Sequence, residues 1–138
     1  MSGSDPVRAP LLSLALAGLA SAASAQTPLT AEEFEAHVTG KTITYRQMGN
    51  LFGIEQYLDG RKVRWSVAPG ECRYGGWYPE DSSICFVYEY DPTPHCWTFW
   101  MKDGALVALS DSGIPGPELH EADRSDTPLN CPGPDVGV

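Results

Sequence analysis

Between Lys41 and Ala122 the sequence alternates short apolar or β-branched segments with turn-forming residues. The segments that read as strands are Thr42–Tyr45, Ile54–Leu58, Val63–Val67, Arg73–Tyr78, Ile84–Tyr90, His95–Met101, Ala105–Leu109 and Glu118–Ala122. Asp-Gly pairs at Asp59 and Asp103 are strong hairpin signals, and strands at this spacing are typical of an antiparallel meander. The sequence therefore predicts a mostly β fold, a small barrel or curled sheet of seven or eight strands.

One helix is predicted at residues 27–40, before the strands begin. Thr30 followed by Glu33 matches a capping box, and Gly40 is placed to end the helix. Phe34 and Val38 lie four residues apart and supply an apolar stripe. We expect this helix to cover an edge or an open end of the sheet.

The connections between the predicted strands are assigned from their glycines, prolines and polar residues. Met48–Gly53 is expected to be a loop, and Asp91–Pro94 is expected to be the turn between the two most aromatic strands. Gly75-Gly76, within a predicted strand, indicates a bulge or a close backbone approach. The last residues, 123–138, are polar and rich in proline and glycine.

The first 25 residues have the layout of a secretory signal peptide. Leu11–Ala20 is an apolar run, and Ala23–Ala25 offers a small-residue cleavage site. The run is shorter than the roughly 20 residues that a membrane anchor needs. Residues preceding the run carry little positive charge, and a translation start at Val7 would give a cleaner leader. We expect residues 26–138 to form a single domain in the periplasm or outside the cell.

The chain is acidic, with 18 Asp and Glu against 9 Lys and Arg, a net charge of −9. This balance argues against nucleic acid or an anionic membrane surface as a partner. Arg61, Lys62 and Arg64 form the one basic cluster, which is expected to be a solvated hairpin end.

Four cysteines, Cys72, Cys85, Cys96 and Cys131, all follow the predicted leader. Their spacing lacks the close pair of a zinc knuckle, so two disulfides are expected and no metal or other cofactor. Cys85 and Cys96 fall on consecutive strands of one hairpin, which favours their pairing and leaves Cys72 with Cys131. The main alternative pairs Cys72 with Cys85 and Cys96 with Cys131, because the first two also flank a hairpin.

Aromatic residues are concentrated between positions 65 and 100, where all four tryptophans fall. Alternation puts Phe86, Tyr88 and Tyr90 on one face of their strand, and it separates Trp97 and Phe99 from Cys96 and Trp100. These rings could simply fill a core, or they could line a ligand cavity at a barrel mouth. The candidate ligand-binding residues are Trp77, Tyr78, Trp97, Trp100 and Arg64.

No catalytic motif is recognisable in the sequence. His37, His95 and His120 have no partner motif and are expected to be surface or capping residues. Glu121, Asp123 and Asp126 lack the spacing of a calcium loop and are taken as solvated.

Three short motifs resemble a group of small exported bacterial proteins of unknown function. These are the strand Gly76-Trp77-Tyr78, the cysteine-centred strand Ile84–Tyr88, and His95–Phe99 followed by Asp103-Gly104. The resemblance implies a β-meander and a Cys85–Cys96 pair, and it implies no activity. A looser similarity exists to small periplasmic β-barrel inhibitors of secreted metalloproteases, which also combine a tryptophan-bearing strand with a disulfide.

The function that the sequence favours is a non-enzymatic binding or accessory module for an unknown small molecule or periplasmic protein. The first alternative is a protease inhibitor whose mature N-terminus, Gln26–Leu29, enters a protease cleft. The second is a small hydrolase that uses His95 or His120 with a nearby carboxylate.

Overall fold

The computed structural model describes residues 2–19, 26–114 and 116–132. Within these residues it contains one α-helix and eight strands. The elements are α1 (Ala31–Val38), β1 (Thr42–Gln47), β2 (Asn50–Leu58), the 3₁₀ turn η1 (Asp59–Arg61), β3 (Lys62–Ser66), β4 (Arg73–Glu80), β5 (Ser83–Tyr88), β6 (Asp91–Lys102), β7 (Ala105–Ser110) and β8 (Leu119–Ser125).

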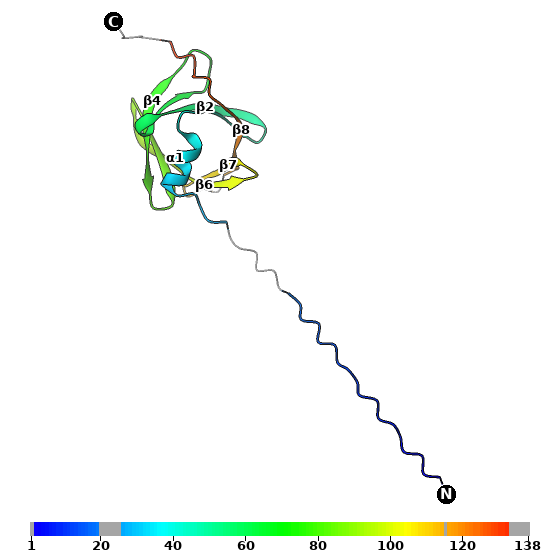
Figure 1. Cartoon of the computed structure of the whole chain (residues 1–138). Helices are drawn as coiled ribbons and strands as arrows, with labels where there is room; N and C mark the ends of the chain where they lie inside the picture. The colour runs from blue at the N-terminus through cyan, green and yellow to red at the C-terminus, as the bar shows by residue number, and fades with distance from the viewer. Residues whose placement is uncertain (1, 20–25, 115, 133–138) are drawn as a thin grey trace.

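The strands form a closed antiparallel barrel in which each strand pairs with the next along the chain (Figure 1). Pairing of β1 with β8 completes the closure, so no strand between them has a free edge. The prediction of a mostly β fold is confirmed, and the strands form a closed barrel and not an open curled sheet.

Helix α1 begins with the predicted capping box. The Thr30 side chain accepts the Glu33 amide, and the Glu33 carboxylate accepts the Thr30 amide. The helix is shorter than residues 27–40, because the backbone is extended at Thr30 and again at Thr39. Gly40 then adopts a φ of 79°, which glycine tolerates without strain.

The helix closes one end of the barrel. In Figure 1, α1 lies within the ring of strands, and its Phe34 and Val38 are completely buried. The Phe34 ring packs edge-on against Tyr57 and Trp77, at centroid distances of 5.7 and 5.1 Å. It lies tilted against the Phe99 ring at 4.7 Å. The helix therefore plugs this end with an aromatic cluster contributed by three different strands.

Two connections differ from the sequence-based expectation. Met48–Gly53 is not a loop, because Met48 and Gly49 alone make the turn, with φ values of 51° and 78°, and β2 starts at Asn50. The turn expected at Asp91–Pro94 lies earlier, at residues 89–90, and β6 starts at Asp91.

The prolines of β6 explain the second difference. Pro92 and Pro94 have no amide to donate and are typical of turns, yet a strand tolerates proline where ladder pairing is interrupted. The register between β5 and β6 shifts at this point, pairing Tyr88 with Asp91 and Phe86 with His95. Pro92 and Pro94 are exposed within the interruption.

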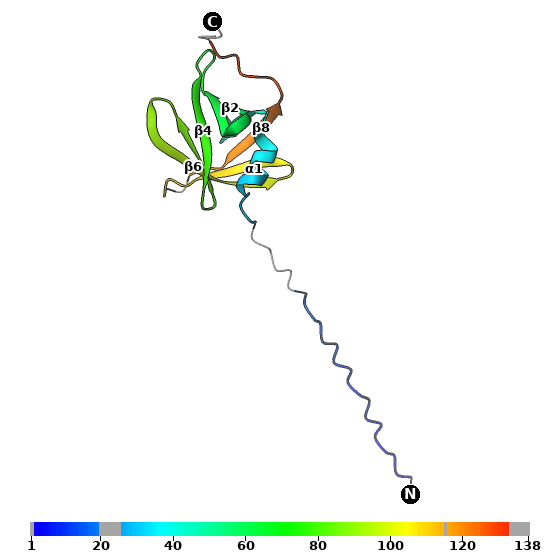
Figure 2. The ribbon, with the colours of Figure 1, turned by 60° about the vertical axis from the view of Figure 1, so that its left-hand side comes forward.

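The cysteines form two disulfides, Cys72–Cys131 and Cys85–Cys96, which confirms the favoured pairing over its alternative. Cys85 and Cys96 are directly opposed on β5 and β6. After β8 the chain runs back across the outside of the barrel, where the Leu129 amide donates to the buried Gln56 side chain. Figure 2 shows this segment leading to the loop between β3 and β4, where Cys131 meets Cys72.

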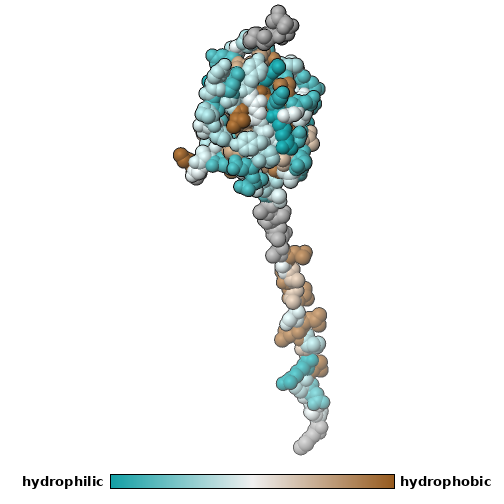
Figure 3. Space-filling view, turned by 90° about the vertical axis from the view of Figure 1, so that its left-hand side faces the viewer, coloured by the Kyte–Doolittle hydropathy of each residue, from teal (hydrophilic) through white to brown (hydrophobic). Residues whose placement is uncertain are grey.

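The N-terminal segment stands apart from the barrel. Residues 2–19 contain no helix or strand, and their leucines are 81–97% exposed. Figure 3 shows these apolar side chains along the projecting segment, while the barrel face in view is mostly hydrophilic. The predicted cleavage site at residues 23–25 lies outside the described residues. No helix in the described ranges is long and apolar enough to cross a membrane.

Candidate functional site

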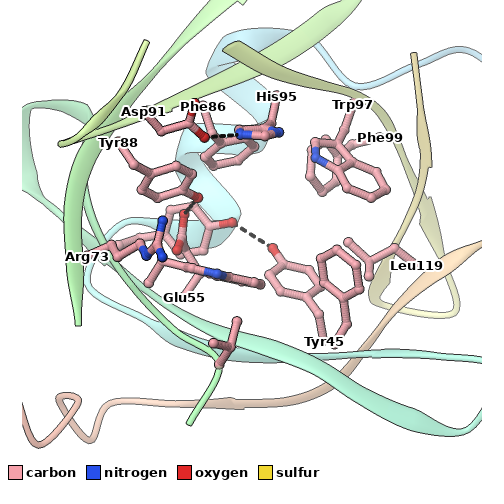
Figure 4. A pocket seen from close by; sticks show the side chains of 14 residues that line it. Tyr45, Glu55, Arg73, Phe86, Tyr88, Asp91, His95, Trp97, Phe99 and Leu119 are labelled. Carbon is pink, nitrogen blue, oxygen red and sulfur yellow. Dashed lines mark hydrogen bonds and ion pairs between the residues drawn. The ribbon is translucent and has the colours of Figure 1, made fainter. Parts of the chain in front are cut away.

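A cavity of about 420 Å³ occupies the end of the barrel opposite the helix. Side chains from every strand except β7 line it (Figure 4). They are Tyr45, Phe52, Glu55, Tyr57, Trp65, Val67, Arg73, Phe86, Tyr88, Asp91, His95, Trp97, Phe99 and Leu119. Phe86 and Phe99 also contact the Phe34 ring, so they form a floor between the cavity and the helix plug.

The walls of the cavity are aromatic. The Phe52 ring lies 5.7 Å from Trp65 and 5.6 Å from Trp97, centroid to centroid, which joins β2, β3 and β6 near the open end. Tyr88 stacks nearly parallel to Phe86 on the opposite side, with an interplanar angle of 8°. These rings give any molecule inside the cavity a largely apolar surface.

Two glycines make room for these rings. A side chain at Gly53 would overlap the Trp65 indole, and one at Gly75 would overlap the Val87 carbonyl and crowd Tyr88. Gly75 thus marks a close approach, as the Gly75-Gly76 pair predicted. The indole and the phenol can lie flat against the barrel wall because neither glycine carries a Cβ.

Glu55 is the most unusual residue of the site. Its side chain points from β2 into the barrel and is only 1% exposed. The Tyr88 hydroxyl donates to Oε1 at 2.7 Å, while Oε2 is buried and has no hydrogen-bond partner among the described residues. Burial raises the pKa of the Glu55 carboxyl well above its usual range, and the Tyr88 hydrogen bond offsets only part of this.

A second buried polar pair lies beside Glu55. The hydroxyls of Tyr45 and Tyr57 are 2.7 Å apart, and both side chains are almost completely buried. Burial raises the pKa of both phenols, and the same effect raises the pKa of Tyr88. Glu55 therefore lies among neutral hydroxyls at physiological pH, and none of the ion pairs formed by the described residues includes it.

The charged residues of the site lie at its mouth. His95 Nε2 is 2.8 Å from an Asp91 carboxylate oxygen, and the two side chains are 49% and 31% exposed. The His95 hydrogen bond lowers the pKa of Asp91, and the nearby positive charge of Arg73 contributes in the same direction. Val67, 54% exposed, completes this rim.

The structure brings one of the five predicted ligand-binding residues, Trp97, into the cavity. Trp77 is buried beneath Phe34 and Arg61 in the helix plug. The other three do not line the cavity: Tyr78 is 36% exposed, Trp100 donates to the Gln26 carbonyl, and Arg64 lies 5.4 Å from the Tyr74 ring. The five residues therefore do not form one site.

The other histidines lie away from the cavity. His37, expected at the surface, is largely buried, and its Nε2 lies 2.9 Å from Glu121. His120 lies 3.4 Å from Glu118, and both side chains are about half exposed. Among the described residues the one cluster of metal-type ligands is Glu80 with Cys85 and Cys96. The two sulfurs are bonded to each other, so neither is available as a thiolate.

Glu55, Tyr45 and Tyr57 are site residues that the sequence pattern did not indicate. In the segment Ile54–Leu58, alternation suggests that the apolar Ile54 and Leu58 face the core together with Gln56. The opposite face, carrying Glu55 and Tyr57, is the one that turns inward. An acidic residue within this strand-forming segment was the available signal, but it reads equally well as a solvent-facing position.

Replacing Glu55 with glutamine should make stability less sensitive to pH. A carboxyl with a higher pKa in the folded state loses stability as pH rises above its unfolded pKa, until the folded pKa is passed. We expect Glu55→Gln to match the wild type near pH 4.5 and to be more stable at pH 8, by roughly 1–3 kcal/mol. Urea denaturation at several pH values measures this, with the exposed Glu71→Gln as the control; a pH-independent difference would contradict it.

Comparison with protein families, with curated proteins and with solved structures finds no match to this chain.

Proposed function

We propose that this chain is a non-enzymatic, extracytoplasmic binding module that holds one small, largely apolar molecule in the open end of its barrel. The observation that carries the proposal is the aromatic cavity of about 420 Å³. Its size falls within the range of roughly 300–1,000 Å³ that is usual for small-molecule sites.

The location outside the cytoplasm is supported by two features. Both disulfides require an oxidising compartment to form and persist. The apolar run at Leu11–Ala20 has the layout of a leader. Its described part, residues 11–19, is exposed and contributes nothing to the barrel core. The resemblance of three short motifs to small exported proteins, if it reflects kinship, would support the same location.

The protease-inhibitor alternative has less support. It requires Gln26–Leu29 to be free to enter a cleft, yet the Leu29 amide donates to the Phe99 carbonyl at 2.8 Å. The Trp100 indole also donates to the Gln26 carbonyl at 3.3 Å. These bonds hold the segment along β6 and would have to be exchanged for protease contacts.

The hydrolase alternative draws on His95, which lies beside Asp91 at the cavity mouth. The described lining residues include no serine, threonine or cysteine, so the attacking group would have to be water. His120, the other candidate, is not part of the lining.

A titration with prodan, a small neutral naphthalene dye, tests the proposed function. We expect one dye molecule to bind with a blue shift of its emission, because the cavity wall is apolar. Trp97→Ala should weaken binding about tenfold or more, the effect of truncating a central aromatic contact. Trp100→Ala is the matched control, since Trp100 follows on the same strand but does not line the cavity.

Two results would refute the proposed function. One is the absence of a blue shift at saturating protein. The other is equal weakening by the two tryptophan variants, which would place the dye on the outer surface.

A further inference from the structure

Among the described residues that line the cavity, one buried polar side-chain atom has no hydrogen-bond partner. Glu55 Oε1 accepts the Tyr88 hydroxyl, but the buried Oε2 accepts and donates nothing among the described residues. An unsatisfied buried polar atom costs roughly 1–3 kcal/mol, so such an atom inside a binding cavity indicates where a ligand group would be stabilised.

The surroundings of Glu55 favour a cation as that group. The Lys and Arg ion pairs of the described residues involve Asp126, Glu35 and Glu121, and none includes Glu55. The hydrogen-bond donor to Glu55 is a neutral phenol. The rings of Phe52, Trp65 and Trp97 form the wall of the same cavity, and aromatic faces attract cations.

The overall charge of the chain also favours a cationic ligand. The chain has a net charge of −9, which raises the local concentration of cations around it. Arg73 is the permanent cation at the mouth, but it lies close enough to Asp91 to lower that residue's pKa. The positive charge of Arg73 is therefore offset by Asp91 at the rim. The described lining of the interior carries the acid Glu55 and no basic residue.

We propose that the cavity binds a protonated primary amine carried on a small apolar body, with the ammonium on Glu55 Oε2 and the body among Phe52, Trp65 and Trp97. An ammonium supplies N–H donors, which Oε2 lacks, and a positive charge, which the aromatic faces attract. This inference rests on the proposed function and specifies the chemical class of its ligand.

The proposal predicts that amine binding releases a proton. Glu55 faces Tyr45 of β1, Tyr57 of its own strand and Tyr88 of β5, and these phenols stay neutral below pH 10. Arg73 of β4 and the Asp91–His95 pair of β6 lie at the mouth, and Glu121 of β8 lies beyond Tyr45. Because burial raises the pKa of the Glu55 carboxyl and binding ionises it, the affinity should rise as pH increases above the usual titration range of a glutamate.

His95 is the one histidine in the described lining of the cavity, so it needs its own variant as a control for proton release. Calorimetry in buffers of different ionisation enthalpy should detect proton release that persists in His95→Gln and disappears in Glu55→Gln.

Three probes of similar size test the ligand class: phenethylamine, phenethyl alcohol and phenylpropanoate. Each competes with prodan for the mature, disulfide-bonded chain at pH 8. We expect the amine to displace the dye at the lowest concentration and Glu55→Gln to weaken the amine about tenfold or more. Alcohol binding should change less than about twofold in that variant, and the exposed control Glu71→Gln should leave all three unchanged.

The outcomes separate this inference from the proposed function. If prodan binds in the cavity but the alcohol or the anion competes best, or Glu55→Gln leaves the amine unaffected, the amine inference is wrong and the binding module stands. If the dye itself does not bind in the cavity, both fail.

Discussion

Replacing Phe34 with alanine is expected to lower the free energy of unfolding by about 3–5 kcal/mol, the largest effect of any single substitution proposed for this chain. Phe34 is completely buried, and four aromatic rings from the barrel strands surround it. No other aromatic side chain of α1 points into the barrel, so truncation leaves a cavity under the helix.

Phe52→Ala is the matched control for Phe34→Ala. The same atoms are removed, but Phe52 already lines a cavity and is only partly buried, so its truncation should cost less than half as much. Urea denaturation of both variants measures the difference. Equal losses, or a Phe34→Ala loss below about 1 kcal/mol, would mean that the helix does not plug the barrel.

Removing the Cys72–Cys131 disulfide is expected to lower the free energy of unfolding by about 4 kcal/mol. The bond spans 59 residues, and the denatured chain gains more entropy when a longer loop is released. The β3–β4 loop, which lies between the lining residues Val67 and Arg73, also loses its link to the C-terminal segment. Prodan binding should therefore weaken in the Cys72→Ala/Cys131→Ala variant.

The Cys85→Ala/Cys96→Ala variant serves as the comparison. Its bond spans 11 residues and joins strands that are already hydrogen-bonded neighbours, so we expect a loss of about 3 kcal/mol and little change in dye affinity. Denaturation and dye titration of both double variants measure these effects. If both affect dye binding equally, or if removal of Cys72–Cys131 is neutral for stability, the anchoring role assigned to the C-terminal segment is wrong.

Most of the fold could be predicted because its signals are local. Alternation, Asp-Gly turns and the Thr30–Glu33 capping box each depend on residues close in sequence, and they identified the strands and the helix start. The starts of β2 and β6 were predicted less well. Gly53, Pro92 and Pro94 suggest loops or turns, but both strands continue through these residues with a shift in pairing register.

The candidate site was harder to predict because its residues come together only when the barrel closes. Trp97, one of the aromatic candidates, lines the cavity on the face of β6 that it shares with Phe99. Trp77 and Trp100 are equally aromatic in sequence, but barrel curvature and the position of α1 put one in the plug and the other outside. Glu55 was missed because period-two alternation cannot say which face turns inward.

The central claim is that the open end of the barrel, and not its outer surface, is the binding site. Nuclear Overhauser effects between bound prodan and the tryptophan rings test this claim most directly. The account predicts cross-peaks from the dye to the Trp65 and Trp97 indoles and none to Trp100. Cross-peaks to Trp100 without any to Trp65 or Trp97 would contradict it.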